Sequence, residues 1–153
     1  MKITTSKVTK KTIIGVDGLD AINIFIEPFE LNSYKARLTI ECFGEAWTHY
    51  WCNMGVDFYT FFMNADTDYL VMKLLSQGVS DTVIDYDKIS KETGIEDIDE
   101  YCLFLYEKDL ENFYGEDWMF RLPTKKSIHY LYLEKIVNTV KKAFELDHKQ
   151  NGL

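Results

Sequence analysis

Apolar and polar residues alternate along the first third of the chain with the period of two that is typical of half-buried β-strands. The three isoleucines of residues 21–27 occupy every second position, and so do the small or apolar residues Ala36, Leu38, Ile40 and Cys42. Between a first strand near residues 10–16 and the second, Asp17-Gly18 favours a turn with positive φ. The pattern predicts an antiparallel β-meander of about four strands within residues 8–53.

The segment Phe43-Gly44-Glu45-Ala46 predicts a tight hairpin between the third and fourth strands. A two-residue loop that begins with glycine favours a type II′ turn, which would place Phe43 opposite Ala46. In that register the apolar face of the third strand lies opposite Trp47, His49 and Trp51. We therefore expect both tryptophans in the core and Tyr50, Thr48 and Cys52 on the other face of the sheet.

From about residue 56 the apolar residues follow the period of amphipathic helices. Two short helices are expected first: residues 58–62 with Asp57 as cap, and a helix with an apolar stripe from Leu70 to Leu75 that is capped by Thr67 or Asp68 and stopped by Gly78. The next two are expected over Asp85 to Thr93, ending at Gly94, and over Glu96 to Phe113. The last is expected over Ile128 to Leu146, with Ser127 as cap. A sheet followed by four or five helices that cover one of its faces predicts a two-layer α+β fold. We expect a single domain over residues 1–153, with a sheet part at about 1–55, a helical part at about 56–148 and a short C-terminal tail.

The net charge of −8 is concentrated in the middle of the chain. Residues 81–120 contain thirteen carboxylates and three lysines, a balance of −10, whereas residues 121–153 carry a balance of +4. Such asymmetry is produced either by solvated helix faces or by a charged partner. An acidic protein repels phosphates, which disfavours direct nucleic-acid binding. The alternative is a nucleic-acid binder that uses the basic residues Lys125, Lys126, Lys141, Lys142 and Lys149.

Several classes of protein are disfavoured by the sequence. No apolar run reaches the length of about 18 residues that a membrane span requires. The first eleven residues lack the apolar core of a secretory signal. Three cysteines without zinc-type spacing are typical of a reduced, cytosolic protein.

The chain contains no phosphate-binding glycine loop, nucleophile elbow or HExxH helix. Two Asp-x-Asp pairs, at 66–68 and 85–87, lack the glycine and distal glutamate of a calcium loop and suit helix caps better. His49 and Cys42 share the apolar face without a third ligand or an orienting carboxylate nearby, so we expect a buried structural histidine. We predict no catalytic residue, metal site or cofactor. A small enzyme with a His or carboxylate site, near His49 or His129, is the alternative.

Aromatic side chains make up 15% of the chain and supply large contact surfaces. Trp118 lies in an irregular acidic stretch, where it either anchors a partner at the surface or packs under its own loop. Aromatic anchors ringed by polar groups are common at tight interfaces. We therefore predict that a partner binds at the acidic residues and this tryptophan, namely Glu96, Asp97, Asp99, Glu100, Glu116, Asp117 and Trp118.

The run from Ile40 to Trp51, followed by Met54-Gly55, resembles small accessory proteins of tailed bacteriophages and prophages, whose pattern is roughly ECxGxAWxxYW. The similarity continues in patches over most of the chain, at Phe61-Phe62, Asp66 to Leu70, Lys73-Leu74, Leu122 to Lys125 and Tyr130 to Val137. Where those proteins often have Trp-Gly after the tyrosine, this chain has Trp51-Cys52-Asn53. The resemblance carries over neither an activity nor site residues.

The resemblance implies a phage or prophage accessory protein in the host bacterial cytoplasm. Small dispensable phage proteins often bind and disable host factors, including restriction and CRISPR systems. We therefore expect a non-catalytic protein that binds a host or phage protein, with no membrane association. Its acidic middle would suit an inhibitor of a nucleic-acid-binding complex, such as an anti-CRISPR that mimics DNA. A structural or homo-oligomeric phage protein is a further alternative, because a twin subunit could cover the sheet face that bears Tyr50 and Thr48.

Overall fold

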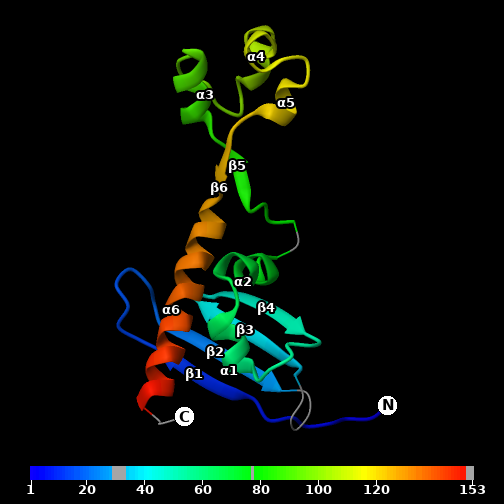
Figure 1. Ribbon diagram of the computed structural model, residues 1–153, viewed down its shortest axis with the longest axis vertical. Coiled ribbons are helices and arrows are strands. Elements are labelled where there is room, and N and C mark those ends of the chain that lie inside the picture. The colour runs from blue at the N-terminus through cyan, green and yellow to red at the C-terminus, as the bar shows by residue number, and fades with distance from the viewer. Residues whose placement is uncertain (29–33, 77, 151–153) are drawn as a thin grey trace. The chain divides into compact units, whose positions relative to one another are not determined.

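The computed structural model describes residues 1–28, 34–76 and 78–150 (Figure 1). The chain divides into two compact units, residues 1–79 with 131–153 and residues 80–130. The first unit holds a four-stranded sheet with helices, and the second is mainly helical. The predicted α+β class is confirmed.

The sheet of the first unit is an antiparallel meander in the order β1-β2-β3-β4, as predicted. Its strands are β1 (Thr9–Ile13), β2 (Ile22–Pro28), β3 (Ala36–Cys42) and β4 (Glu45–Trp51). One face is buried at every second position, so that Ile22, Ile24 and Ile40 are fully enclosed. This alternation confirms the inward and outward faces read from the sequence.

The β3–β4 hairpin differs from the prediction in its turn. Phe43 and Gly44 both have positive φ, 52° and 77°, which is the geometry of a type I′ loop rather than type II′. Cys42 therefore pairs with Glu45 and Ile40 with Trp47, a register displaced by two residues from the expected one. Because side chains alternate with a period of two, this displacement leaves every residue on its predicted face.

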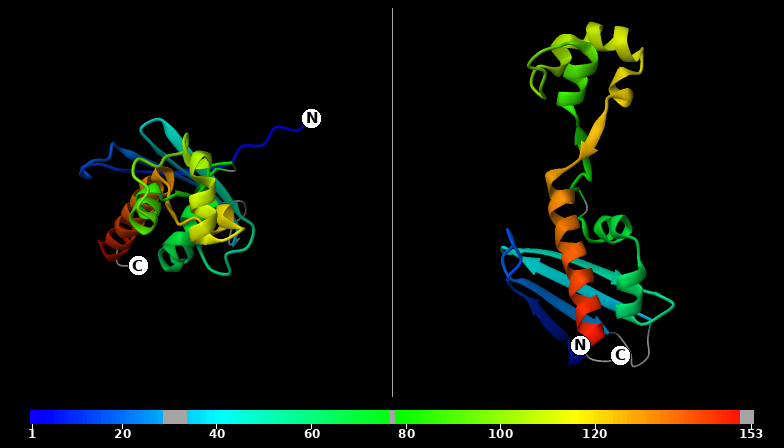
Figure 2. Two further views of the ribbon diagram at one scale, coloured as in Figure 1. Left: turned by 90° about the horizontal axis from the view of Figure 1, so that it is seen from above. Right: turned by 60° about the vertical axis from the view of Figure 1, so that its left-hand side comes forward.

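Helices α1 (Phe58–Asn64), α2 (Thr67–Leu74) and the part of α6 (Ile128–Gln150) that belongs to the first unit cover one face of the sheet (Figures 1 and 2). The Trp47 ring packs against Tyr132 of α6 at 5.9 Å between centroids. Asp57 caps α1 as predicted, with its side chain accepting from the Thr60 amide. The predicted cap of α2 is wrong, because Asp66 accepts from the amides of residues 68 and 69.

Helices α2 and α6 end at residues other than those predicted. Helix α2 ends at Leu74, before Gly78, since Leu75 already has an extended backbone. Helix α6 extends four residues beyond the expected Leu146, and Ser127 caps it as predicted by accepting from the Tyr130 amide at 3.1 Å. Of the predicted C-terminal tail, residues 151–153 lie outside the described residues.

The second unit begins and ends with a two-stranded ribbon of β5 (Thr82–Ile84) and β6 (Thr124–Lys126), which the sequence did not predict. Between these strands lie α3 (Tyr86–Thr93), the 3₁₀ helix η1 (Leu103–Tyr106), α4 (Glu107–Tyr114) and α5 (Trp118–Arg121). Helix α3 confirms its prediction, with Asp85 as N-cap and Gly94 at a φ of 75° as C-cap. Its capping glycine adopts the left-handed conformation that ends many helices.

The predicted helix over Glu96 to Phe113 is wrong in its first half. The Asp99 carboxylate accepts hydrogen bonds from the Tyr101 and Cys102 amides, at 2.9 and 3.0 Å, and Asp97 has a φ of 56°. A side chain that takes up nearby amides competes with the helix for the same donors. Residues 96–102 therefore form turns, and the α-helix begins at Glu107.

Two compact units within one chain do not show whether the chain folds as one domain. The single domain over residues 1–153 therefore stays a prediction. None of the described helices combines the length and the apolar content that crossing a bilayer demands.

The hairpin turn generates a stability prediction. Phe43 holds a left-handed backbone that costs a bulky residue roughly 1–2 kcal/mol, and its ring is 64% exposed. Asparagine is favoured at this position of a type I′ turn. We expect Phe43→Asn to raise the free energy of unfolding by about 1 kcal/mol in urea denaturation.

Gly44→Ala is the matched control for this prediction. A Cβ at Gly44 meets no atom within 4 Å, so its cost is conformational alone, and we expect a loss of about 1 kcal/mol. Destabilisation by Phe43→Asn would contradict the type I′ assignment.

Candidate functional site

The six carboxylates predicted to bind a partner all lie on the surface of the second unit. Four of them, Glu96, Asp97, Asp99 and Glu100, occupy the turns that precede η1, and Glu116 and Asp117 precede α5. All six side chains are exposed. The structure thus agrees with a charged surface, and partner binding by these residues stays a prediction.

Trp118 is not an exposed anchor, which decides between the two alternatives left open by the sequence. Its side chain is only 5% exposed and lies in the core of the second unit. The other buried members of this core are Ile89, Ile98, Leu103, Leu110 and Leu122. The indole packs beneath its own segment and occupies the core of this small unit.

Several large apolar side chains of η1, of the turn before it and of α5 point to solvent instead. Phe104 and Leu105 of η1 are 65% and 82% exposed, and Phe120 of α5 is 88% exposed. Tyr101, in the turn before η1, and Met119 of α5 are also exposed. The rings of Phe104 and Trp118 meet at 6.0 Å, which brings η1 against the start of α5. We call Tyr101, Phe104, Leu105, Met119 and Phe120, with the six carboxylates beside them in sequence, the acid-rimmed surface.

Reasoning from the sequence missed the apolar part of this surface. It placed Tyr101 and Leu105 in the expected helix over Glu96 to Phe113, where the structure has a turn and the 3₁₀ helix η1. A signal was present, because Leu103-Phe104-Leu105-Tyr106 is an unbroken apolar run. No single face of a helix can bury four consecutive residues, so some of them had to remain exposed.

The charges of the second unit are segregated. Residues 95–120 contain nine carboxylates and a single lysine, Lys108. Three lysines outside this segment are paired with other carboxylates of the unit. Lys125 contacts Asp85 and Asp87 at 3.4 and 3.2 Å, Lys126 contacts Asp81 at 3.5 Å, and Lys88 contacts Glu92 at 3.8 Å. Among the described residues, no basic side chain forms an ion pair with the six carboxylates of the acid-rimmed surface.

A polar contact joins α3 to α4 within the second unit. The Tyr114 hydroxyl donates to the Glu92 carboxylate at 2.7 Å. Burial, followed by this hydrogen bond to an anion, raises the pKa of Tyr114 far above its ordinary value, so the phenol stays a donor. Arg121 donates to the Tyr114 carbonyl at 3.1 Å and connects α5 to the same point. These bonds connect α3, α4 and α5, and α5 carries the exposed Met119 and Phe120.

At the alternative site, His49 is only partly buried, whereas a buried histidine was expected. His49 pairs with Leu38 in the sheet and packs edge-on against Trp51, with ring centroids 4.7 Å apart. Burial, and then the nearby Lys73 charge, lowers the pKa of His49, so its imidazole is neutral near pH 7. Cys42 instead accepts a hydrogen bond from the Tyr132 hydroxyl at 3.5 Å. Within the described residues, no group of three or more His, Cys, Asp or Glu side chains is placed to hold a metal ion.

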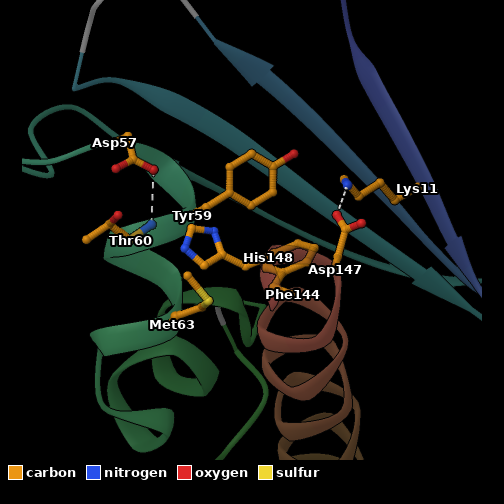
Figure 3. Close-up of a pocket in the computed structure, with 8 residues that line it drawn as sticks. All are labelled: Lys11, Asp57, Tyr59, Thr60, Met63, Phe144, Asp147 and His148. Atoms are coloured by element: carbon orange, nitrogen blue, oxygen red, sulfur yellow. Dashed lines mark hydrogen bonds and ion pairs between the residues drawn. The ribbon is translucent and has the colours of Figure 1, made fainter. Parts of the chain in front are cut away.

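A separate pocket of about 500 Å³ lies in the first unit between β1, α1 and α6 (Figure 3). Eight side chains line it: Lys11, Asp57, Tyr59, Thr60, Met63, Phe144, Asp147 and His148. The Lys11 ammonium forms an ion pair with Asp147 and lies 5.5 Å from the centre of the Tyr59 ring. The residues come from distant parts of the chain, and no pattern in the sequence indicates that they meet.

Comparison with known proteins identifies one family. The model of Phage_phiTE_072, described as a phage family, matches residues 1–145. No curated protein and no solved structure matches the chain. The family match covers nearly the whole chain and confirms the association with phages that the Trp-containing hairpin suggested. The protein belongs to this phage family.

Proposed function

We propose that this phage protein is a non-catalytic accessory protein that binds a protein partner through its acid-rimmed surface. The observation that carries the proposal is the exposure of Tyr101, Phe104, Leu105, Met119 and Phe120 around one small core. Large exposed apolar groups rimmed by polar residues are characteristic of interaction sites. Burying these side chains in a complex would gain the hydrophobic free energy that folding of this unit leaves unused.

The charge of the rim supports a basic partner. Nine carboxylates in residues 95–120 repel an acidic surface and attract one rich in lysine and arginine. Such pairing speeds association and weakens as salt screens it. We infer a partner whose apolar cleft is bordered by basic residues, as in a protein that binds nucleic acid. An inhibitor of a host defence or nucleic-acid-processing system, such as an anti-CRISPR acting in the host cytoplasm, is the specific form of this proposal.

A symmetric homodimer through the same surface is disfavoured by its charge. In a two-fold interface, each patch faces its own copy. The carboxylates of one copy would then oppose those of the other without cations to balance them, which costs free energy at every contact. The partner is therefore a different protein.

Replacing two exposed aromatic residues tests how much the apolar side chains contribute to the affinity for the partner. We expect the double variant Phe104→Ser, Phe120→Ser to lose at least tenfold in affinity for the partner, because truncating central aromatic anchors commonly costs about 2 kcal/mol or more. The partner is first recovered by affinity capture from phage-infected cells and identified by mass spectrometry. Its dissociation constant is then measured by calorimetry with purified proteins.

Ile14→Ser supplies the matched control for that measurement. Ile14 is 77% exposed but belongs to the first unit, so its loss removes a similar apolar group away from the acid-rimmed surface. Unchanged affinity in the double variant, or an equal loss in the control, would contradict the proposed surface.

Neutralising four carboxylates of the acid-rimmed surface tests how much their charge contributes to the rate of association with the partner. Glu96→Gln, Asp97→Asn, Asp99→Asn and Glu100→Gln together remove four charges, and an asparagine oxygen at 99 can still accept from the Tyr101 and Cys102 amides. We expect the association rate to fall at least tenfold at low salt, and the two proteins to converge at high salt. Stopped-flow measurements over a range of NaCl concentrations give both quantities, and a salt dependence equal to that of the natural protein would argue against a basic partner.

A further inference from the structure

The pocket of the first unit has the size and composition of a small-molecule site, and it is independent of the acid-rimmed surface. Its volume of about 500 Å³ falls within the range of about 300–1,000 Å³ that is typical of ligand pockets. It is bordered by β1, α1 and the C-terminal part of α6, which all belong to the first unit. Rigid elements on three sides favour a preformed site over an adaptable groove.

The middle of the pocket is lined by flat and polarisable groups. Figure 3 shows the Tyr59 ring, the His148 imidazole and the Met63 thioether gathered between the two charged ends. The Phe144 ring packs against Tyr59 at 5.2 Å between centroids and is almost fully buried. Burial raises the pKa of Tyr59, so its hydroxyl stays neutral. Aromatic faces and a thioether of this kind favour an aromatic ring as ligand.

The two ends of the pocket differ in how their carboxylates are balanced. Asp147 is neutralised by Lys11, whose pKa is raised by the hydrogen bond to that carboxylate. Asp57, at the other end, accepts from the Thr60 amide, and hydrogen bonds from Thr60 lower the pKa of its carboxyl. No basic side chain of the described residues pairs with Asp57. The pocket thus contains one ionised carboxylate that lacks a cation.

We propose that this pocket binds an aromatic amine, with the ring against Tyr59 and Met63 and the ammonium group paired with Asp57. A cationic ligand supplies the charge that the Asp57 end lacks. An anionic ligand of the same shape is repelled by Asp57 and finds Lys11 already occupied by Asp147. The proposal does not depend on the protein partner and goes beyond it.

Three probes with one ring system test the charge preference. Tryptamine is a cation, 3-methylindole is neutral and indole-3-acetate is an anion. Each is titrated into the full-length protein with ¹³C-labelled methionine methyl groups, and Met63 is assigned with Met63→Leu. We expect a saturable shift of the Met63 methyl with tryptamine, about tenfold weaker binding of 3-methylindole, and no saturation with indole-3-acetate.

Asp57→Asn tests the role of the carboxylate without removing the cap of α1, because asparagine caps helices about as well as aspartate. We expect this variant to bind tryptamine about tenfold more weakly and 3-methylindole unchanged. Asp66→Asn, at the equivalent cap of α2 outside the pocket, is the control and should leave both affinities unchanged.

The proposal is overturned if tryptamine produces no saturable Met63 shift, if indole-3-acetate binds equally well, or if Asp57→Asn leaves tryptamine binding intact. Circular dichroism of each variant separates loss of binding from loss of folding. Because the pocket and the acid-rimmed surface belong to different units, either result leaves the test of protein binding unaffected.

Discussion

The burial of one sheet face is the constraint on which the first unit depends. Ile22, Ile24, Leu38 and Ile40 expose none of their surface, so the meander exists only because helices cover that face. An antiparallel sheet with one apolar face cannot remain open to water without losing most of its stabilising free energy. Aromatic contacts secure the cover, since Phe144 of α6 packs against Phe58, Tyr59 and Phe62 of α1. The pocket lies between β1, α1 and α6, and Tyr59 and Phe144 belong both to this cluster and to the lining of the pocket.

The second unit obeys the opposite constraint, because it is too short to bury all of its apolar residues. Residues 80–130 enclose a core of six well-buried side chains, one of which is the large indole of Trp118. A chain of this length buries a smaller share of its surface than a larger domain does. Phe104, Leu105 and Phe120 are consequently left outside. Their exposure reduces the stability of the unit. It also increases the hydrophobic free energy that would be gained if a partner covered them.

Those features that depend on neighbouring residues could be predicted from the sequence. The alternation of Ile22, Ile24 and Ile26 fixed the sheet face, and Asp57 and Ser127 indicated where α1 and α6 begin. The hairpin register was displaced by two residues because Gly44 suits either position of a two-residue loop, and only the backbone shows that Phe43 also has positive φ. The assignment of residues to the two faces of the sheet was still correct, because a displacement by two residues leaves every side chain on the same face.

Prediction failed where a local competition or a distant contact decides the structure. Asp99 lies near the start of the helix expected over Glu96 to Phe113, yet its carboxylate accepts hydrogen bonds from the Tyr101 and Cys102 amides, and no helix forms there. The strands β5 and β6 have three residues each, too few for a period to be read. The pocket joins β1 to residues near both ends of the helical part, and no pattern in the sequence relates Lys11 to Asp147.

The coexistence of exposed apolar groups and unpaired carboxylates on one small unit has a physical consequence for specificity. Apolar side chains alone would associate with any similar surface, including further copies of the protein. The nine carboxylates of residues 95–120 oppose that association by mutual repulsion, and they do so most strongly against other acidic surfaces. A basic surface removes the repulsion and gains the hydrophobic contact in the same event. In the proposed complex, the charge would select the partner, whereas the apolar residues would supply most of the affinity.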